Sequence, residues 1–368
     1  MRINKWISRL VLLPVSKIYG LATFVRNKMF DFGILRQREF DVPVVVVGNI
    51  AAGGTGKTPH VEYLIDTLRH NYHIGVLSRG YKRRTKGFVM ATQRSTPLDI
   101  GDEPYQIFHK FSSSIVVAVC ENRVEGITEL LRIDPKINLV ILDDAFQHRY
   151  VKPTVSIVLT EFNRPVFEDH LLPYGNLREG RGALRRADMV IVTKCSESTK
   201  ALDYTIFKAH LNLFPYQKLY FSRFLYGALK PVFPDQAEGV PPSLEWLTED
   251  DMILTVAGIG NPRPFVRYVK HFRPKVRVNI FPDHHFFSKK DIELIEKRFM
   301  TMPGRSRFIV TTEKDAVRLA NNPYFPHELK AITFYLPIKV DFMRQESDSF
   351  ETAIRKLIRD KQSQTPGV

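Results

Sequence analysis

A glycine-rich segment near residue 50 carries the residues best suited to chemistry. A β-branched run at 44–47, a glycine-rich turn and a helical apolar pattern at 61–68 follow one another along the chain. This strand–loop–helix context is what a phosphate-binding P-loop requires. Glycines let backbone N–H groups turn toward phosphate oxygens at a helix N-terminus, whose dipole favours negative charge. The predicted phosphate-binding residues are Ala51, Ala52, Gly53, Gly54, Thr55, Gly56, Lys57 and Thr58.

The last two residues of this segment have separate predicted roles. Lys57 can reach the outer phosphates, and the Thr58 hydroxyl can ligate Mg²⁺. Ala51 stands where the usual G-x-x-x-x-G-K-[ST] pattern has its first glycine. The alternative interpretation is a glycine-rich turn that holds no ligand.

Two acidic pairs are candidates for metal binding or proton transfer. Asp143-Asp144 follows an apolar run at 137–142, and a carboxylate at such a strand end orders Mg²⁺ or its water in P-loop proteins. Asp102-Glu103 lies in a short loop or at a helix start. A base for a hydroxyl nucleophile, a metal ligand and a simple helix cap are all compatible with this second pair.

Two further segments carry polar residues after predicted strands or in loops. Asp283-His284-His285 ends a strand pattern and favours proton transfer over zinc binding, because the chain offers no Cys or further His at ligand spacing. The segment 176–182 has glycine hinges, and its arginines can contact phosphates or be solvated. The same two interpretations apply to Arg79 and the basic residues after it.

Composition sets broad limits on the function. The 368 residues suggest two domains. The net charge of +15 suits a nucleic acid, an anionic membrane or a phosphorylated substrate without choosing among them. Cys120 and Cys195 have no paired spacing, which fits a reducing compartment and argues against a disulfide scaffold or a zinc knuckle.

The first forty residues are basic and amphipathic. They contain eight Lys or Arg against two acidic residues, with apolar residues at helical spacing from Trp6 to Val25. No apolar run approaches the length of about 20 residues that spans a bilayer. The residues alone are compatible with a helix lying in a membrane interface and with a helix packed on the domain.

Alternating strand and helix patterns predict an α/β fold. We expect a P-loop NTPase-type α/β/α domain and a smaller α/β C-terminal domain. Two extended segments, 218–225 and 332–340, should pair as a two-stranded linker. The predicted ranges are 1–30 for an amphipathic N-terminal helix, 31–215 for the P-loop domain, 216–345 for the linker and smaller domain, and 346–368 for a C-terminal helix and polar tail.

Six segments, in order and spanning roughly residues 40 to 320, resemble the tetraacyldisaccharide 4′-kinase family, the lipid A 4′-kinases of Gram-negative bacteria. That family commonly has Gly at the position of Ala145 and a small hydroxyl residue at the position of Ala51. The matching segments are Val47-Gly48-Asn49-Ile50 with Gly53-Gly54-Thr55-Gly56-Lys57-Thr58-Pro59, Ser78-Arg79-Gly80-Tyr81, Gly101-Asp102-Glu103-Pro104, Leu142-Asp143-Asp144-Ala145-Phe146-Gln147-His148, Leu172-Pro173-Tyr174-Gly175-Asn176-Leu177-Arg178-Glu179 and Phe281-Pro282-Asp283-His284-His285.

The resemblance implies a kinase that transfers the γ-phosphoryl group of ATP to the 4′-hydroxyl of a tetraacyldisaccharide 1-phosphate, giving lipid IVA. It implies Mg²⁺ as cofactor, the cytoplasmic face of the inner membrane as location, and membrane contact through the N-terminal helix. We expect a monomer that binds no nucleic acid.

The resemblance also implies roles for individual residues. Asp102 would be the catalytic base or its orienting partner, coupled to His284 across the domain cleft. Thr58, Asp144 and Glu103 would serve the metal. The other residues expected at the site are Lys57, Arg178, Asp143, His148, Arg123, Glu179 and Arg79.

Two other classes of protein share parts of this pattern. A P-loop switch ATPase or GTPase would act through a protein partner, but the N/T-K-x-D guanine motif is missing at Thr193-Lys194 and at Lys314-Asp315. A nucleic-acid-dependent ATPase is suggested only by the net charge, and no nucleic-acid module is recognisable.

Overall fold

The computed structural model describes residues 5–237, 243–272, 275–304 and 306–362. The chain forms two compact units. Unit 1 comprises Met1–Gln93, Ile107–Phe224 and Val340–Val368, and unit 2 comprises Arg94–Gln106 and Leu225–Lys339. This division differs from the predicted ranges, because 94–106 groups with unit 2 and the C-terminal segment groups with unit 1.

Unit 1 is built on a sheet with nine strands among the described residues. Neighbouring strands from β8 to β4 are parallel, and β3 is antiparallel to β4. The spatial order is β14 (Ile338–Phe342), β8 (Lys218–Tyr226), β7 (Met189–Thr193), β6 (Val155–Glu161), β1 (Val44–Asn49), β5 (Leu139–Asp143), β2 (Ile74–Ser78), β4 (Ile115–Val119) and β3 (Val89–Met90).

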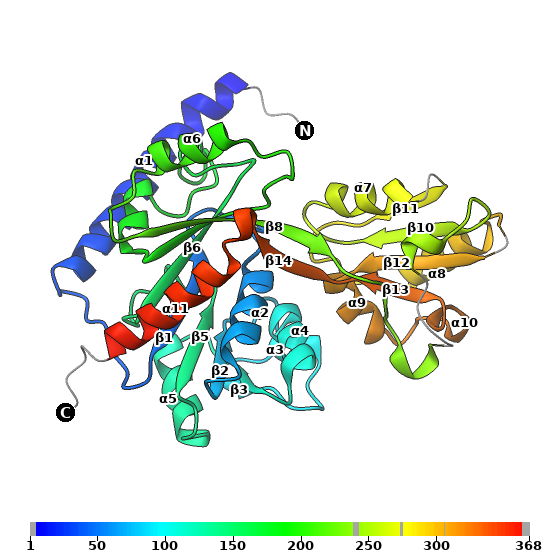
Figure 1. The fold of residues 1–368 in the computed structure, drawn as a ribbon, viewed down its shortest axis with the longest axis horizontal. Helices are drawn as coiled ribbons and strands as arrows, with labels where there is room; N and C mark the ends of the chain where they lie inside the picture. The colour runs from blue at the N-terminus through cyan, green and yellow to red at the C-terminus, as the bar shows by residue number, and fades with distance from the viewer. Residues whose placement is uncertain (1–4, 238–242, 273–274, 305, 363–368) are drawn as a thin grey trace. The chain divides into compact units, whose positions relative to one another are not determined.

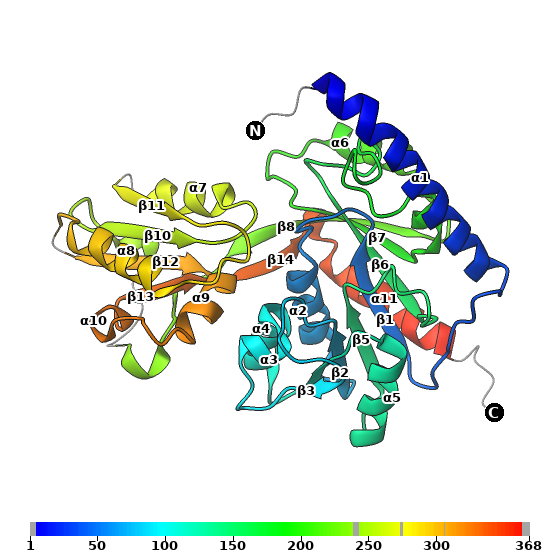
Figure 2. The ribbon, with the colours of Figure 1, turned by 180° about the vertical axis from the view of Figure 1, so that it is seen from behind.

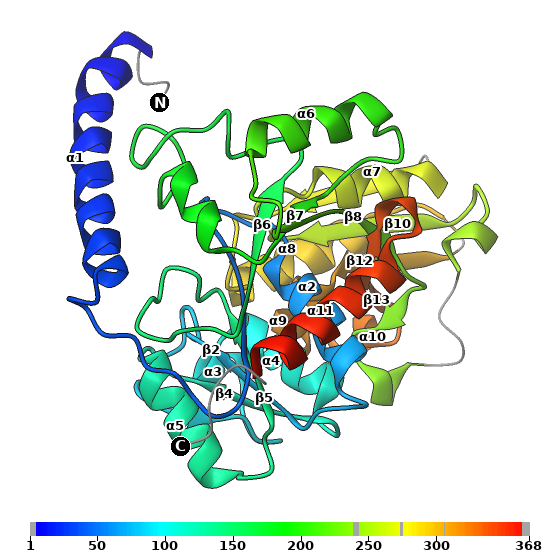
Figure 3. The same ribbon diagram turned by 60° about the vertical axis from the view of Figure 1, so that its left-hand side comes forward.

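Helices cover both faces of this sheet (Figures 1 and 3). Val44 and Val46 of β1 point into a core shared with α5 (Arg123–Ile133) and α6 (Ala201–Leu211). On β8, Phe221 points into that core, while its neighbour Tyr220 contacts Phe350 of α11 (Ser347–Gln362) on the other face. Helix α2 (Lys57–Leu68) packs beside α11. The unit is therefore an α/β/α sandwich.

The N-terminal helix α1 (Lys5–Asp31) lies along the outside of unit 1, seen as the long blue helix in Figure 2. The ring of Phe30 contacts Tyr150 edge-on, with centroids 5.1 Å apart. Ile18 and Leu21 on the outer face of α1 are 70% and 63% exposed. Within the described part of the chain, no helix combines the length and apolar character needed to cross a membrane.

Unit 2 is a smaller α/β unit. Its sheet has the order β11 (Val276–Ile280), β10 (Met252–Ala257), β12 (Arg307–Thr312), β13 (Thr333–Leu336) and β9 (Lys230–Pro231), parallel except for β9. One face packs on α8 (Lys289–Met300) and α9 (Glu313–Ala320), and the other packs on α7 (Arg263–Phe272).

The remaining helices are short or begin in one unit and end in the other. Helix α4 starts in unit 2 and ends in unit 1. The bounds are α3 (Pro97–Ile100), α4 (Asp102–Phe111), α10 (His327–Lys330), η1 (Arg181–Arg186), η2 (Pro234–Gln236), η3 (Leu244–Trp246) and η4 (Met343–Gln345).

The predicted fold class is confirmed, with one correction at the linker. The single extended segment predicted at 332–340 is two strands, β13 in unit 2 and β14 in the nine-stranded sheet. Pro337 lies between them, and its missing N–H group interrupts strand pairing. Strands β8 and β14 are hydrogen-bonded neighbours, and each continues in sequence into unit 2.

We expect Phe350→Ala to destabilise unit 1 by about 3–5 kcal/mol, because it leaves a cavity where a fully buried ring stacks on Phe342 with centroids 4.4 Å apart. Equilibrium unfolding in urea, followed by circular dichroism, measures the change. Leu202→Ala is the control, since Leu202 on α6 is 65% exposed. A loss below about 1 kcal/mol in Phe350→Ala would show that α11 contributes little to the unit.

Candidate functional site

The P-loop begins with a short backbone pairing to a distant segment. The Ala52 N–H donates to the Asn176 carbonyl at 2.7 Å, and the Arg178 N–H donates to the Ile50 carbonyl at 2.7 Å. An antiparallel bridge lies between these two bonds. The Arg164 guanidinium adds a hydrogen bond to the Ala52 carbonyl at 3.0 Å. The first residues of the P-loop are therefore held by backbone hydrogen bonds to residues 176–178 and by the Arg164 side chain.

The far end of the loop depends on a glycine in the left-handed region. Gly56, with φ of 90°, precedes the first residue of α2, and a Cβ atom there would lie 2.4 Å from the Phe224 ring. Asn49 Nδ2 donates to the Thr55 hydroxyl at 2.9 Å. The Thr193 hydroxyl donates to the Thr55 carbonyl at 2.8 Å. These contacts hold the loop in the turned conformation that exposes N–H groups at a helix N-terminus.

Two cations converge on one carboxylate beside the loop. Lys57 Nζ lies 3.5 Å from Asp144 Oδ1, and Arg178 Nη1 lies 3.4 Å from the same oxygen. The sequence predicted all three residues at the site, and the structure brings them together. A carboxylate between two cations at a P-loop matches the charges that bind a phosphate chain together with a divalent cation.

The other residues predicted beside the P-loop differ in burial: Asp143 and Arg123 are buried, and Arg79 is exposed. Asp143 is 1% exposed and lies in register with Val47, the last valine of β1. Burial lowers the pKa of Arg123 to about 10, although Asp143 and Asp144 oppose the shift. Burial and the nearby Arg123 lower the pKa of His148 to about 4, so this ring is neutral at pH 7. Arg79 is exposed and adds to the positive potential at both groups.

Oxygen ligands for Mg²⁺ are present, but they are divided between the two units. Thr58 and Asp144 belong to unit 1, where the hydroxyl at the start of α2 and the carboxylate after β5 are the ligand types that Mg²⁺ takes. Glu103 belongs to unit 2. Among the described residues, no group of three or more His, Cys, Asp or Glu side chains is arranged to hold a metal.

Helix α1 braces the wall formed by Arg178 and Glu179. The Tyr19 hydroxyl donates to the Arg178 carbonyl at 2.8 Å. Asn27 Nδ2 and Arg186 Nη2 both donate to Glu179 Oε2, at 2.7 and 2.6 Å. Glu179 is 2% exposed, so its carboxylate joins α1 to the wall and does not face the solvent.

A second cluster of predicted residues lies within unit 2. Asp102 begins α4, and its Oδ2 atom lies 3.5 Å from His284 Nδ1. The two residues were expected on different domains, but both group with unit 2. Arg318 ties segment 94–106 to α9, because its Nη2 and Nε atoms donate to Asp102 Oδ2 at 2.7 and 3.0 Å.

The charges around Asp102 keep its carboxylate ionised. Burial alone would raise its pKa, but the contact with His284 and the hydrogen bonds donated by Arg318 outweigh burial and lower the pKa to about 2. The neighbouring Glu103 accepts a hydrogen bond from Lys314 Nζ at 2.6 Å. Both carboxylates of the Asp102-Glu103 pair are therefore bound to cations of α9.

The remaining histidine of the predicted cluster is structural. His285 Nε2 lies 3.0 Å from Asp291 Oδ2, in the first turn of α8. The His285 ring also stacks on Phe281 with centroids 4.8 Å apart. The ring that lies near Asp102 is that of His284, whose Nδ1 atom is 3.5 Å from Asp102 Oδ2.

Several residues at these two clusters escaped sequence reasoning. Arg318 and Lys314 lie four residues apart on α9, so that both reach the Asp102-Glu103 pair. The available signal was Thr312 followed by Asp315 and Arg318 at i, i+3 and i+6, a helix cap with charges on one face. Tyr19 and Asn27 carried no comparable signal.

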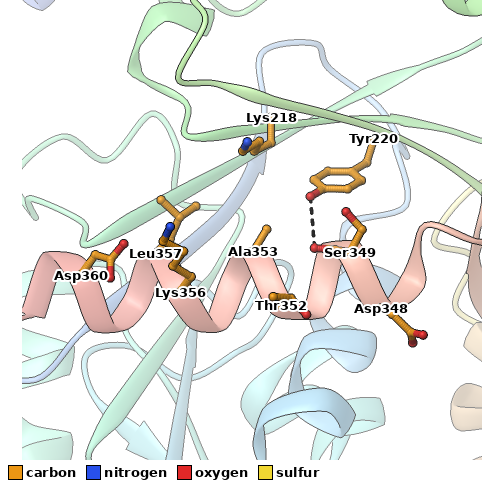
Figure 4. Close-up of a pocket in the computed structure, with 9 residues that line it drawn as sticks. All are labelled: Lys218, Tyr220, Asp348, Ser349, Thr352, Ala353, Lys356, Leu357 and Asp360. Carbon is orange, nitrogen blue, oxygen red and sulfur yellow. Dashed lines mark hydrogen bonds between the residues drawn. The ribbon is translucent and has the colours of Figure 1, made fainter.

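Two surface hollows in unit 1 differ in their relation to the P-loop. The larger, of about 570 Å³, lies between β8 and α11 and contains none of the predicted site residues (Figure 4). The Tyr220 hydroxyl donates to the Ser349 carbonyl at 3.4 Å inside it. The smaller, of about 200 Å³, is lined by Arg164 and Asn176, which contact the P-loop backbone.

Comparisons with known proteins agree on one family. The family model described as tetraacyldisaccharide-1-P 4′-kinase matches residues 8–359. The tetraacyldisaccharide 4′-kinase of Bacteroides thetaiotaomicron is 49% identical over 365 residues, covering 98% of this chain and 94% of the relative. That of Flavobacterium johnsoniae is 39% identical, covering 96% and 98%. The crystal structure of LpxK from Aquifex aeolicus in complex with ATP superposes with a TM-score of 0.71 at 27% identity, covering 94% and 98%.

We expect a stability loss between pH 6.5 and 4 that depends on His60. Burial lowers the pKa of this ring, whose Nδ1 and Nε2 atoms contact Gly56 and Ser222, from 6.5 to about 4. In that window the unfolded chain binds a proton that the native ring does not, so stability falls as the pH falls, by about 3 kcal/mol in total.

Unfolding free energies of wild type and His60→Gln across this window measure the effect. The variant should show a shallower dependence on pH, because glutamine does not titrate. The exposed His70→Gln serves as control. Equal slopes in wild type and His60→Gln would contradict the assignment of a neutral, buried ring.

Proposed function

Because this chain belongs to the tetraacyldisaccharide-1-P 4′-kinase family, we propose that it transfers the γ-phosphoryl group of ATP to the 4′-hydroxyl of a tetraacyldisaccharide 1-phosphate. The product is lipid IVA, an intermediate of lipid A biosynthesis. The observation that carries this proposal is the convergence of Lys57 and Arg178 on Asp144 beside a fully formed P-loop.

The phosphate chain of ATP binds along the loop in this proposal. The backbone N–H groups of 53–58 surround the phosphates, and Lys57 moves from Asp144 to the outer phosphate oxygens. The Thr58 hydroxyl and the Asp144 carboxylate would hold Mg²⁺, which would supply charge neutralisation on the transferring group. Arg178 then neutralises further negative charge, since a guanidinium fork matches phosphate oxygens.

Asp102 and His284 accept the proton of the attacking hydroxyl. As the 4′-oxygen bonds to phosphorus, the O–H bond breaks and its proton passes to the Asp102 carboxylate and on to His284 Nδ1, 3.5 Å away. The electron pair of the broken P–O bond leaves with ADP. A sugar hydroxyl is weakly acidic, so a positioned acceptor lowers the barrier as bond formation proceeds.

The lipid substrate requires contact with a membrane, and we assign that contact to α1. The outer face of this helix exposes apolar side chains, while its inner face is hydrogen-bonded to the wall of the site. Lys17 and Lys28 add positive charge near this face, which suits anionic lipid. The proposed location is the cytoplasmic face of the bacterial inner membrane, with the protein acting as a monomer.

We expect wild-type protein to transfer labelled γ-phosphate from Mg·ATP to a tetraacyldisaccharide 1-phosphate in detergent micelles. Lys57→Ala should lower the rate at least about 100-fold, because it removes the cation at the transferring phosphate. Thin-layer chromatography of the labelled lipid measures the transfer. Lys152→Ala is the control, since Lys152 forms an exposed ion pair with Glu39. Lys57-dependent nucleotide hydrolysis without labelled lipid would favour a switch ATPase or GTPase instead.

We expect Ile18→Glu with Leu21→Glu to weaken binding to vesicles containing phosphatidylglycerol at least about 100-fold, because two apolar side chains no longer enter the lipid. Flotation of the vesicles measures binding, and phosphorylation in micelles shows whether the site is intact. The matched control is Leu202→Glu with Ile206→Glu on α6, where both side chains are also exposed. Unchanged flotation of the α1 variant would exclude this face as the membrane contact.

A further inference from the structure

Arg318 has no role in the proposed phosphoryl transfer so far, yet it contacts both Asp102 and His284. Its Nη2 atom lies 2.7 Å from Asp102 Oδ2 and 3.3 Å from His284 Nδ1. Only 7% of the arginine side chain is exposed. A buried guanidinium with these two contacts fixes the relative position of the carboxylate and the imidazole.

The other terminal nitrogen of Arg318 is hydrogen-bonded to buried groups. Its Nη1 atom donates to Asp315 Oδ1 at 2.9 Å and to the Gly258 carbonyl at 3.2 Å. Asp315 is fully buried and also accepts hydrogen bonds from the Gly258 N–H and the Thr312 hydroxyl, at 2.8 and 2.7 Å. The guanidinium of Arg318 therefore joins the buried Asp315 carboxylate to the half-buried pair of Asp102 and His284.

The His284 backbone is held at the same turn. Its N–H donates to the Gly258 carbonyl at 3.1 Å, the carbonyl that Arg318 also contacts. The residue adopts a φ of 55°, which is uncommon for a non-glycine residue. The ring position is thus set by its own backbone and by Arg318 together.

Hydrogen-bond chemistry restricts what His284 Nδ1 can do. A guanidinium only donates and an ionised carboxylate only accepts. Next to Arg318 Nη2, Nδ1 must present its lone pair. Next to Asp102 Oδ2, it must carry a proton to form a bond. A single ring nitrogen cannot do both at once, so Arg318 and Asp102 compete for its protonation state.

We propose that Arg318 is a positioning residue that holds the lone pair of His284 Nδ1 toward its own Nη2 atom, so that Nδ1 can accept the proton arriving through Asp102. Once Nδ1 carries the proton, it no longer accepts a hydrogen bond from Arg318 and instead donates one to Asp102. Without Arg318, the neighbouring carboxylate favours the other neutral tautomer, in which Nδ1 already carries the proton. The ring then has no lone pair facing Asp102 that could take the proton onward.

This inference rests on the proposed kinase function, but its first test needs no substrate. Full-length protein labelled with ¹⁵N-histidine reports each ring's tautomer in two-bond ¹H–¹⁵N spectra at neutral pH, and His284→Gln identifies the signal. We expect a proton on Nε2 in wild type and on Nδ1 in Arg318→Met. A proton on Nδ1 in wild type, or an unchanged tautomer in folded Arg318→Met, would overturn the proposal.

Kinetics give the second test. Arg318→Met should lower kcat on the order of 100-fold while KM for ATP and for lipid stays within about twofold, because the lost contact serves proton transfer and not binding. Arg318→Lys, the variant to use if Arg318→Met does not fold, keeps the charge but has a single nitrogen, and should lower kcat less. An equal rise in KM for both substrates with unchanged kcat would show a merely structural role.

Arg307→Met is the matched control for loss of a half-buried, hydrogen-bonded arginine in the same unit. Arg307 Nη1 donates to backbone carbonyls at the end of α8, namely those of Phe299, Met300 and Met302. It should lower stability without changing the His284 tautomer or kcat. A wild-type protein that does not phosphorylate lipid would refute the proposed function, whereas phosphorylation that is unaffected by Arg318→Met would refute only this inference.

Discussion

The geometry of unit 1 depends on the backbone pairing of residues 50–52 with residues 176–178. This contact is made by main-chain groups, and so it survives changes of side chain. It fixes the start of the P-loop, and it simultaneously places Arg178 where its guanidinium reaches Asp144. Helix α1 then attaches to the same segment through Tyr19. This short backbone pairing thereby aligns the phosphate-binding loop, the wall formed by Arg178 and Glu179, and the N-terminal helix.

The two clusters follow a common electrostatic rule. Asp144 in unit 1 and Asp102 in unit 2 are each partly exposed carboxylates beside a more buried cation, Lys57 and Arg318 respectively. A buried arginine without a carboxylate partner would be costly, so each pair constrains where its partner can lie. Such pre-positioned charges suit phosphoryl transfer, which depends mainly on placement and on charge neutralisation.

The P-loop and most strands were predictable, because glycine spacing and β-branched runs are local signals. The coupling of Asp102 with His284 was implied only by the family resemblance, which placed the two residues on different domains, whereas both belong to unit 2. Glycine and proline chemistry explains both Gly56 and the break at Pro337. The grouping of 94–106 with unit 2 was not predictable. It depends on Arg318 and Lys314, whose partners are more than two hundred residues away in the sequence. Contacts of that range leave no periodic signal in a single sequence.

The order of the segments along the chain bears on synthesis. The chain leaves unit 1 twice and returns to it, and residues 340–368 complete the unit with an edge strand and α11. The aromatic rings of Phe342 and Phe350 in this last segment pack on Tyr63, near the beginning of the chain. A nascent chain on the ribosome thus has every residue of unit 2 before it has the last layer of unit 1. The phosphate-binding half of the protein can reach its final packing only after α11 has left the exit tunnel.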